Sequence, residues 1–237
     1  MKKITFLIPV YNEEKTVGKA IEIVLSLKKI KNKEIIIIDN GSTDRSQEII
    51  KKFKKKSLKV ILRRKNLGYG ATIKQAIEIS TGEYMYIHFS DNEYDISPVF
   101  EMIRLAKKYN LDAVFGSRLK KYNFFKRILL LKFKPSYLGT LIITTLYNIL
   151  YNKNFSDVIG SKFYKLSSIK KIYKNDSNFF NYDFILKNRL ISGNFKIKEV
   201  FTNYKPRFTK YGNVKYYHIF PAVYEILKFK LLHTMLK

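Results

Sequence analysis

The chain has 237 residues, of which 46% are hydrophobic, and it contains no cysteine. This length suffices for one sizeable core, and the absence of cysteine excludes a disulfide framework and a thiolate metal site. The formal net charge of +27 predicts an anionic partner, either nucleic acid, an anionic membrane surface or a phosphorylated substrate, unless the excess lysine only coats a solvated surface.

The first half of the chain alternates short β-rich runs with longer helical patterns. The expected strands are Ile4–Val10, Glu34–Asp39, Leu58–Arg63, Glu83–Phe89 and Asp112–Gly116. The expected helices between them are Lys15–Lys29, Asp44–Lys56, Gly70–Ser80 and Ser97–Tyr109. This alternation is typical of βαβ units and predicts an α/β fold with a mainly parallel sheet. Because Ile35–Ile38 is apolar on both faces, we place that strand in the centre of the sheet.

Four polar clusters each follow an expected strand or its flank. They are Pro9–Glu14, Asp39–Asp44, Asn66–Gly70 and Ser90–Glu93. Because ligands of open α/β sheets bind beyond the carboxyl ends of the strands, the clusters predict one binding site. Tyr11 could stack on a base, Glu13 could accept hydrogen bonds from a ribose, and Asp39 could accept one from a base N–H. The alternative is that Glu13 and the residues after Asp39 only favour the starts of the following helices.

The second half of the chain mixes aromatic, basic and apolar residues. Residues 124–134 are both cationic and apolar, and a helical stretch follows at Tyr137–Tyr151. The C-terminal pattern predicts a helix with one apolar face, formed by Phe220, Val223, Tyr224, Leu227, Leu231 and Met235. Such amphipathic helices can lie in a membrane interface, with their basic residues facing anionic head groups. The alternative is that they pack on the main domain or on a second subunit.

Membrane-spanning and secretory segments are not predicted. The stretch Tyr137–Tyr151 is shorter than the roughly 18 apolar residues of a spanning helix and contains polar residues. The N-terminal run Ile4–Val10 is short for a signal peptide, and no small-residue cleavage site follows it. We therefore expect a cytoplasmic protein that associates peripherally with a membrane.

The order and the residue sequences of the four clusters resemble those of the family 2 glycosyltransferases of the GT-A fold, which use nucleotide-activated sugars. The segments that carry the resemblance in the first half are Pro9–Glu14, Asp39–Asp44, Asn66–Gly70 and Gly116–Arg118. Later segments are similar to the branch that includes dolichol-phosphate mannosyltransferase: Asp157–Phe163, Asn181–Phe184, Tyr204–Arg207 and Gly212–Lys215. The resemblance implies a single GT-A, Rossmann-like domain, with a donor-binding half at 1–118, an acceptor-side half at 119–218 and a basic amphipathic helix at 219–237.

The resemblance also implies roles in binding the donor. The implied nucleotide-binding residues are Pro9, Tyr11, Glu13, Asp39, Asn40 and Ser90. The family usually carries Asp-X-Asp, which binds Mg²⁺ or Mn²⁺ against the pyrophosphate, whereas Phe89 replaces the first carboxylate here. Asp91 remains, and Glu93 could act as a second oxygen ligand because residues two apart in an extended segment point the same way. A clamp of Arg and Lys is the alternative way to neutralise the leaving group.

The acceptor decides which further residues are needed. A hydroxyl acceptor needs a general base, whereas a lipid phosphate arrives ionised and needs only cations. The resemblance implies that Asp183 is the acidic residue near the acceptor, and Asp157 is the second candidate for the base. The candidate phosphate-binding residues are Arg118, Arg207, Lys210 and Lys215. Our leading hypothesis is transfer of a sugar from a nucleoside diphosphate to a polyprenyl phosphate, dolichyl or undecaprenyl, at the cytoplasmic face of a membrane.

Two other functions remain open on the sequence alone. One is a transferase that extends a surface polysaccharide or lipid-linked glycan at a hydroxyl. The other is a basic protein that binds nucleic acid or a membrane surface without catalysis. We expect no nucleic-acid partner, because the sequence offers no recognition helix, zinc module or single-strand-binding signature. A homo-oligomer is compatible with all three functions.

Overall fold

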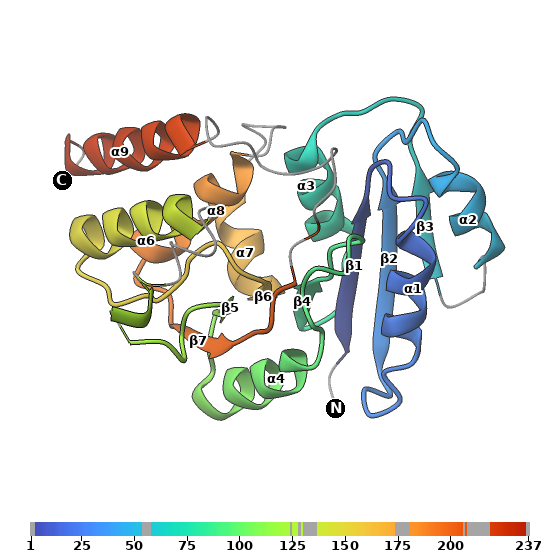
Figure 1. Cartoon of the computed structure of the whole chain (residues 1–237), viewed down its shortest axis with the longest axis horizontal. Helices are drawn as coiled ribbons and strands as arrows, with labels where there is room; N and C mark the ends of the chain where they lie inside the picture. Colours follow the sequence, from blue (N-terminus) through green and yellow to red (C-terminus); the bar gives the residue numbers. More distant parts are fainter. Residues whose placement is uncertain are drawn as a thin grey trace.

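A seven-stranded sheet forms the centre of the protein (Figure 1). The computed structural model describes residues 3–53, 58–123, 125–127, 129, 137–173, 181–205, 207 and 219–235. The strands are β1 (Ile4–Val10), β2 (Lys33–Asp39), β3 (Leu58–Leu62), β4 (Tyr84–Ile87), β5 (Ala113–Ser117), β6 (Lys162–Lys165) and β7 (Ile197–Phe201). Their order across the sheet is β3-β2-β1-β4-β6-β5-β7.

The sheet is mainly parallel, as expected. Strands β1, β2, β3 and β4 pair in parallel, and β5 pairs in parallel with β7. Strand β6 is antiparallel to both of its neighbours, β4 and β5. The predicted α/β class is therefore confirmed, with one antiparallel strand inserted between two parallel groups.

The apolar strand β2 does not lie in the centre of the sheet, so that prediction was wrong. Its neighbours are β1 and the edge strand β3, and β4 occupies the central position. Its residues are apolar on both faces because Ile35 and Ile37 pack into one core cluster and Ile36 and Ile38 into the other. Coverage by helices on both faces, rather than a central position, explains its composition.

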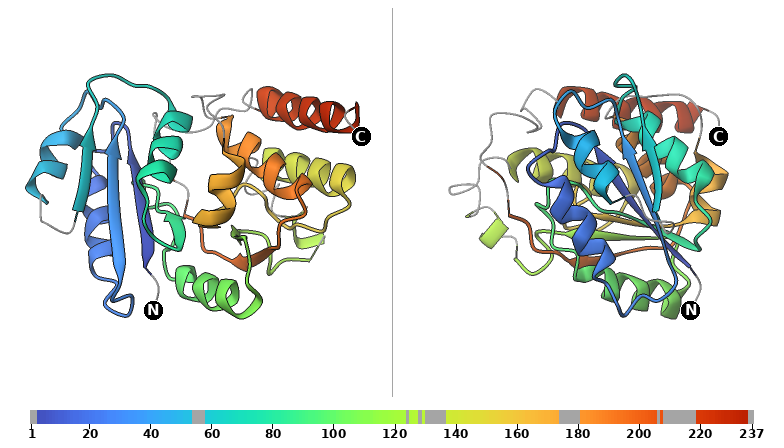
Figure 2. Two further views of the ribbon diagram at one scale, coloured as in Figure 1. Left: turned by 180° about the vertical axis from the view of Figure 1, so that it is seen from behind. Right: turned by 90° about the vertical axis from the view of Figure 1, so that its right-hand side faces the viewer.

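Helices cover both faces of the sheet (Figures 1 and 2). The helices are α1 (Val17–Leu25), α2 (Ser46–Lys52), α3 (Tyr69–Ile79), α4 (Pro98–Tyr109), α6 (Tyr137–Tyr151), α7 (Leu166–Ile172), α8 (Tyr182–Ser192) and α9 (Ile219–Met235). Helices α1, α2 and α4 contribute to the core on one face, and α3, α6, α7 and α8 to the core on the other. Helix α9 adds Ala222 and Ile226 to that second core.

Helix α1 is shorter than the sequence pattern predicts. It ends at Leu25 rather than Lys29. The Lys33 ammonium donates to the carbonyl oxygens of Leu25 and Leu27, at 2.9 and 3.1 Å. A cation that binds the free carbonyls at a helix end stabilises the termination there.

A buried carboxylate, Glu34, joins three strands at the end of the sheet opposite the polar clusters. It accepts hydrogen bonds from Thr5 of β1 and from Thr81, and it lies 2.7 Å from the Lys59 ammonium of β3. Burial alone would raise the pKa of Glu34, but the hydrogen bonds from Lys59, Thr5 and Thr81 lower it to about 2. Glu34 therefore stabilises the folded state above its ordinary pKa of 4.5, and this stabilisation is lost as the pH falls toward 2.

We expect Glu34→Gln to lower the free energy of unfolding by about 1.5–3 kcal/mol at neutral pH, because the lost hydrogen bonds involve a charged acceptor. Urea denaturation measures the change, and the exposed Glu22→Gln of α1 is the matched control. The difference from the wild type should shrink as the pH falls from 4.5 toward 2, since the carboxyl is then protonated in the unfolded state but still ionised in the folded state. An equal difference at neutral and acidic pH would contradict this assignment.

Candidate active site

The loops after β1 and β2 are bound to each other at the carboxyl end of the sheet. The backbone amide of Asn12 donates to Ser42 Oγ at 2.9 Å, and the backbone amide of Thr43 donates to the side-chain oxygen of Asn12, Oδ1, at 2.8 Å. The Glu13 amide nitrogen donates to Ser46 Oγ at 2.8 Å. Asn12 adopts a positive φ of 53°, which asparagine tolerates. The first two polar clusters are therefore one connected unit, as their strand-end positions predict.

Asp39 holds the second cluster together. Its carboxylate is fully buried and accepts hydrogen bonds from the Gly41 and Ser42 amides, the Ser42 hydroxyl and the Gln47 side chain. Gly41 has a φ of +79°, and a Cβ there would meet the backbone of Lys65. In this structure Asp39 organises its own loop, and its contact with a base stays a prediction.

Asn40 connects the second cluster to the third. The side-chain nitrogen of Asn40 donates to Asn66 Oδ1 at 2.7 Å. Its side-chain oxygen accepts from Arg63 at 2.7 Å and from the backbone amide of Leu67 at 3.1 Å. Arg63 also donates to Gln75 of α3 at 2.7 Å. The position thus requires both a donor and an acceptor, which asparagine supplies and a carboxylate does not.

The fourth cluster closes against the first. The Ser90 hydroxyl donates to the Pro9 carbonyl oxygen at 2.8 Å, and the Asn92 side chain donates to the Thr16 carbonyl oxygen at 3.0 Å. Tyr11, which directly follows β1, is 46% exposed. The structure therefore brings all four clusters to one edge of the sheet.

Arg207 lies among three carboxylates at this edge. Its guanidinium donates to both oxygens of Glu13, at 2.8 Å each, and its amide nitrogen donates to Glu93 Oε1 at 2.9 Å. The same guanidinium lies 4.0 Å from Asp91 Oδ2 and 3.6 Å from Glu93 Oε1. Three carboxylates and one guanidinium leave a formal charge of −2, and we call these four residues the carboxylate cluster.

Asp91 and Glu93 converge by a different geometry from the one predicted. They do not lie in an extended segment, because Asn92 between them has a positive φ of 56° and the Glu93 amide donates to Asp91 Oδ1 at 3.0 Å. A tight turn, rather than strand alternation, therefore directs both carboxylates toward Arg207.

The electrostatics of the carboxylate cluster suit a cation. Burial, and then the charges of Glu93 and Glu13, raise the pKa of Asp91 to about 6. Carboxylate oxygens and an unbalanced charge of −2 fit a hard divalent cation such as Mg²⁺ or Mn²⁺. In the part of the chain that the structure describes, however, no three His, Cys, Asp or Glu side chains are arranged to hold a metal ion by themselves. A cation here would need further oxygens, such as those of a diphosphate.

Arg118 and Asp157 form a buried ion pair. The Asp157 carboxylate accepts from Arg118 Nε at 2.6 Å and Nη2 at 3.0 Å, and from the amides of Arg118 and Ile159. Asp157 is fully buried. Since its oxygens face the guanidinium and the backbone, its position does not favour the predicted role of a base.

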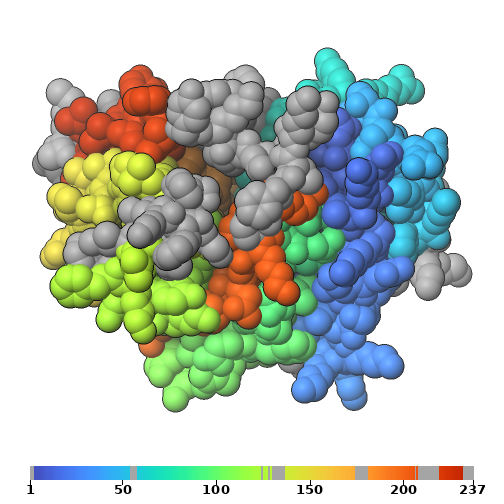
Figure 3. Space-filling model, in the orientation of Figure 1, coloured from blue at the N-terminus to red at the C-terminus, as the bar shows by residue number. Residues whose placement is uncertain are grey.

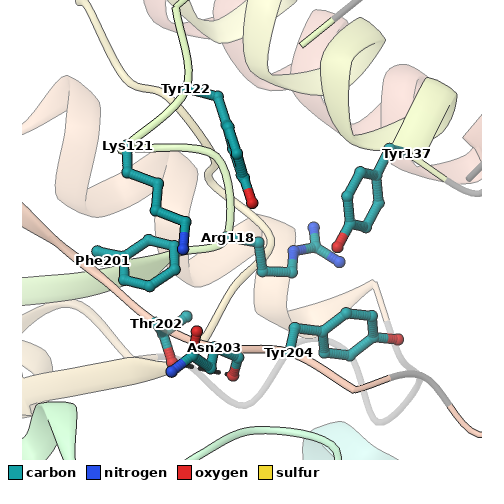
Figure 4. Close-up of a pocket in the computed structure, with 8 residues that line it drawn as sticks. All are labelled: Arg118, Lys121, Tyr122, Tyr137, Phe201, Thr202, Asn203 and Tyr204. Carbon is teal, nitrogen blue, oxygen red and sulfur yellow. Dashed lines mark hydrogen bonds between the residues drawn. The ribbon is translucent and has the colours of Figure 1, made fainter. Parts of the chain in front are cut away.

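A pocket opens beside the Arg118 guanidinium (Figure 4). Its lining residues are Arg118, Lys121, Tyr122, Tyr137, Phe201, Thr202, Asn203 and Tyr204. The rings of Tyr137 and Tyr204 lie 5.3 and 5.1 Å from the guanidinium carbon. Tyr204 also packs on Tyr94, with ring centroids 4.9 Å apart, and the Lys205 amide donates to the Glu93 carbonyl oxygen. The pocket therefore adjoins the carboxylate cluster.

Asp183 lies in the first turn of α8, and its carboxylate pairs with the buried Lys187 of the same helix at 2.6 Å. Its side chain is partly exposed. Burial, and then the Asp183 charge, raise the pKa of Tyr69. Tyr69 in turn stacks on Phe89, with ring centroids 6.3 Å apart, directly before the Ser90 turn. The charge of Asp183 therefore acts on a ring that packs beside the fourth cluster, and the role of Asp183 as a base stays a prediction.

Several site residues were not predicted from the sequence, and two predicted ones are not described. Lys210 and Lys215 lie outside the described residues. Glu199 of β7 was missed, although its carboxylate accepts from the Ser156 and Asp157 amides and fixes the turn that carries Asp157. A single acidic residue in a short strand gives no signal of such a contact. Tyr204 could have been predicted as a site residue, because it begins the Tyr204–Arg207 segment that carries the family resemblance.

Comparison with known sequences gives consistent matches. The profile described as glycosyl transferase family 2 matches residues 5–173. Poly-β-1,6-N-acetyl-D-glucosamine synthase of Staphylococcus epidermidis is 38% identical over 116 residues, which are 48% of this chain and 28% of that protein. Cholesterol galactosyltransferase of Borreliella burgdorferi is 31% identical over 186 residues, 73% of this chain and 50% of that protein. The chain thus spans half or less of the length of these two curated relatives.

Solved structures show the same fold. Glucosyl-3-phosphoglycerate synthase from Mycobacterium tuberculosis, in complex with Mn²⁺, UDP and phosphoglyceric acid, matches with a TM-score of 0.62 at 14% identity, over 97% of this chain and 78% of that one. A mannosyltransferase from Pyrobaculum calidifontis, in complex with GDP-Man and Mn²⁺, matches with a TM-score of 0.62 at 12% identity, over 100% and 65%. The GT-A fold expected from the sequence is confirmed by these neighbours.

Proposed function

The chain belongs to glycosyl transferase family 2, and on that basis we propose that it transfers a sugar from a nucleoside diphosphate donor. The carboxylate cluster is the observation that carries the proposal. Glu13, Asp91 and Glu93 meet at the carboxyl ends of β1 and β4, where an open α/β sheet binds its ligand. Two solved neighbours hold a nucleotide together with Mn²⁺, which supports a donor of the same kind here.

In this proposal the donor's base stacks on the exposed Tyr11 and its diphosphate faces Asp91 and Glu93. A divalent cation held by these two carboxylates would neutralise the charge that develops on the leaving nucleoside diphosphate. Arg207 is placed to share that task, because its guanidinium already lies within 4.0 Å of Asp91. Binding of an anionic diphosphate would compete with Glu13 for the Arg207 guanidinium.

We further propose that the acceptor is a polyprenyl phosphate presented at a membrane. The pocket beside the carboxylate cluster is lined by two cationic side chains, Arg118 and Lys121. Asp157 already balances the charge of Arg118, so Lys121 supplies the unbalanced charge that suits an ionised phosphate. An ionised phosphate attacks without a general base, so this reaction does not require Asp157 to act as one. We assign Asp157 the role of holding Arg118 in position.

A thermal-shift screen of nucleoside diphosphates and their sugars, with and without Mn²⁺ or Mg²⁺, tests donor binding. A ligand that binds the native state stabilises it by about 2.7 kcal/mol at a concentration 100 times its Kd. We expect one base to raise the melting temperature, and the divalent cation to increase that shift. Nucleosides without phosphates are the control. No shift with any diphosphate would overturn the donor assignment.

The acceptor is tested by incubating the protein with labelled nucleotide sugars and polyprenyl phosphate. We expect labelled lipid, and we expect Asp183→Asn to retain most of the activity because no base is needed. If the acceptor is instead a glycan hydroxyl, the lipid stays unlabelled, a parallel incubation with glycan in place of the lipid gives labelled glycan, and Asp183→Asn nearly abolishes that transfer while donor binding persists. Glu101→Gln, in an exposed ion pair of α4, is the control for a charge change far from the site.

A further inference from the structure

Helix α9 is apolar on two opposite sides. Ala222 and Ile226 are buried and pack into the core shared with α6 and α8. The opposite side carries four large apolar residues that are 40–71% exposed: Phe220, Tyr224, Leu227 and Leu231. These positions are spaced by four, three and four residues, so they form one continuous stripe along the helix. Four of the six residues that the sequence predicts for the apolar face are thus exposed. Val223 is partly buried, and the side chain of Met235 lies outside the described part of the structure.

Helix α6 carries a second exposed stripe. Leu138, Ile142 and Ile149 are 43–73% exposed and share one side of the helix. Helix α6 contains no charged residue. Figure 3 shows α6 and α9 side by side on one face of the molecule, in yellow and red. We call the seven exposed residues of the two stripes the α6–α9 surface.

The charges around the α6–α9 surface are positive. The one acidic residue of α9, Glu225, faces α8, where its carboxylate accepts from Asn181 and its carbonyl oxygen from Asn188. Lys228 is exposed beside the stripe, and Lys230 lies over the Tyr151 ring at the end of α6. The border of the surface therefore carries the ammonium groups of Lys228 and Lys230, and the Glu225 carboxylate of α9 is already hydrogen-bonded.

We propose that the α6–α9 surface docks on an anionic lipid bilayer, with both helices lying in the interface. Interfacial helices bury an apolar face about 5–10 Å into the head-group boundary while their basic residues contact anionic lipids. Each basic residue near such a surface contributes about 1 kcal/mol of attraction. Among the described residues, no helix is long and apolar enough to cross a bilayer.

Charge favours a lipid surface over a second copy of the chain as the occupant. Each copy carries a formal net charge of +27, so contact between two copies would bring like charges together, whereas an anionic bilayer attracts them. This docking is independent of the proposed chemistry, although it would place the acceptor-side half of the protein against the membrane.

Sedimentation with lipid vesicles tests the proposal. We expect the wild type to bind vesicles of equimolar phosphatidylcholine and phosphatidylglycerol and to bind phosphatidylcholine vesicles weakly. The double variant Phe220→Gln and Leu231→Gln should bind the anionic vesicles about 100-fold more weakly, because two large apolar side chains no longer partition. The matched control is Phe100→Gln with Tyr109→Gln, which removes two exposed aromatic rings from α4 and should bind as the wild type does.

Three outcomes would overturn the docking proposal. The wild type fails to bind anionic vesicles, or the α9 variant binds them as well as the wild type does, or sedimentation without lipid shows a dimer that the α9 variant dissociates. The last result would assign the surface to a second copy. Thermal shifts with nucleoside diphosphates are measured on the same variants, so that a failure of membrane docking is distinguished from a failure of donor binding.

Discussion

Asp157→Asn should lower the free energy of unfolding by about 3–5 kcal/mol, because it leaves the buried Arg118 guanidinium without a counter-charge. The carboxylate receives two hydrogen bonds from that guanidinium and two from the Arg118 and Ile159 amides, and both partners are buried. An asparagine amide would also direct an N–H group toward these donors. Arg118 donates to Thr140 of α6 as well, so the loss extends to the packing of that helix.

Urea denaturation at neutral pH measures this effect, with Glu101→Gln as the control. Glu101 pairs with Arg104 on an exposed face of α4, and such pairs contribute at most about 1 kcal/mol. Burial alone would raise the pKa of Asp157, but the charge and hydrogen bonds of Arg118 hold it below its ordinary value of 3.8. The wild type should therefore keep this stabilisation down to pH 3.8 and lose it below. A variant as stable as the wild type would refute a structural role for the pair.

The periodicity of the first half of the chain was sufficient to predict its fold. Strands such as β2 are short apolar runs between helical patterns, and their bounds agree within a few residues. Strand β6 was missed because a four-residue strand that begins with a lysine has no apolar pattern. Lys162 is nonetheless fully buried and donates to the Gly160 carbonyl oxygen, and burial, then the charge of Lys187, lowers its pKa to about 7. Only tertiary contacts identify this position as interior.

In the candidate site, too, features set by local sequence were predictable and contacts between residues far apart in sequence were not. Strand-end position predicts that the loops of Glu13 and Asp91 meet, because parallel strands direct their carboxyl ends to one edge. The contact of Arg207 with Glu13 joins residues 194 positions apart, and no local pattern encodes it. Likewise, the sequence predicts the apolar face of α9. It does not predict that Ala222 and Ile226 on the other side pack into the core.

The contact of Arg207 with Glu13 makes two mechanisms of leaving-group neutralisation distinguishable. If the carboxylates hold a divalent cation, activity depends on Asp91 and on added metal. If Arg207 alone stabilises the diphosphate, removal of a nearby negative charge leaves activity unchanged or raises it, because the guanidinium is released toward the donor. The charge of −2 in the carboxylate cluster favours the first mechanism.

Asp91→Asn should therefore lower the turnover of sugar transfer by about 10²–10³-fold at saturating donor, the range expected when one group that stabilises developing charge is removed. Transfer of labelled sugar across a series of Mn²⁺ concentrations measures the change. Glu101→Gln is the control, because it also removes one carboxylate charge but lies in the exposed ion pair with Arg104 on α4. Wild-type turnover in Asp91→Asn would contradict metal binding at this carboxylate and leave Arg207 as the group that neutralises the diphosphate.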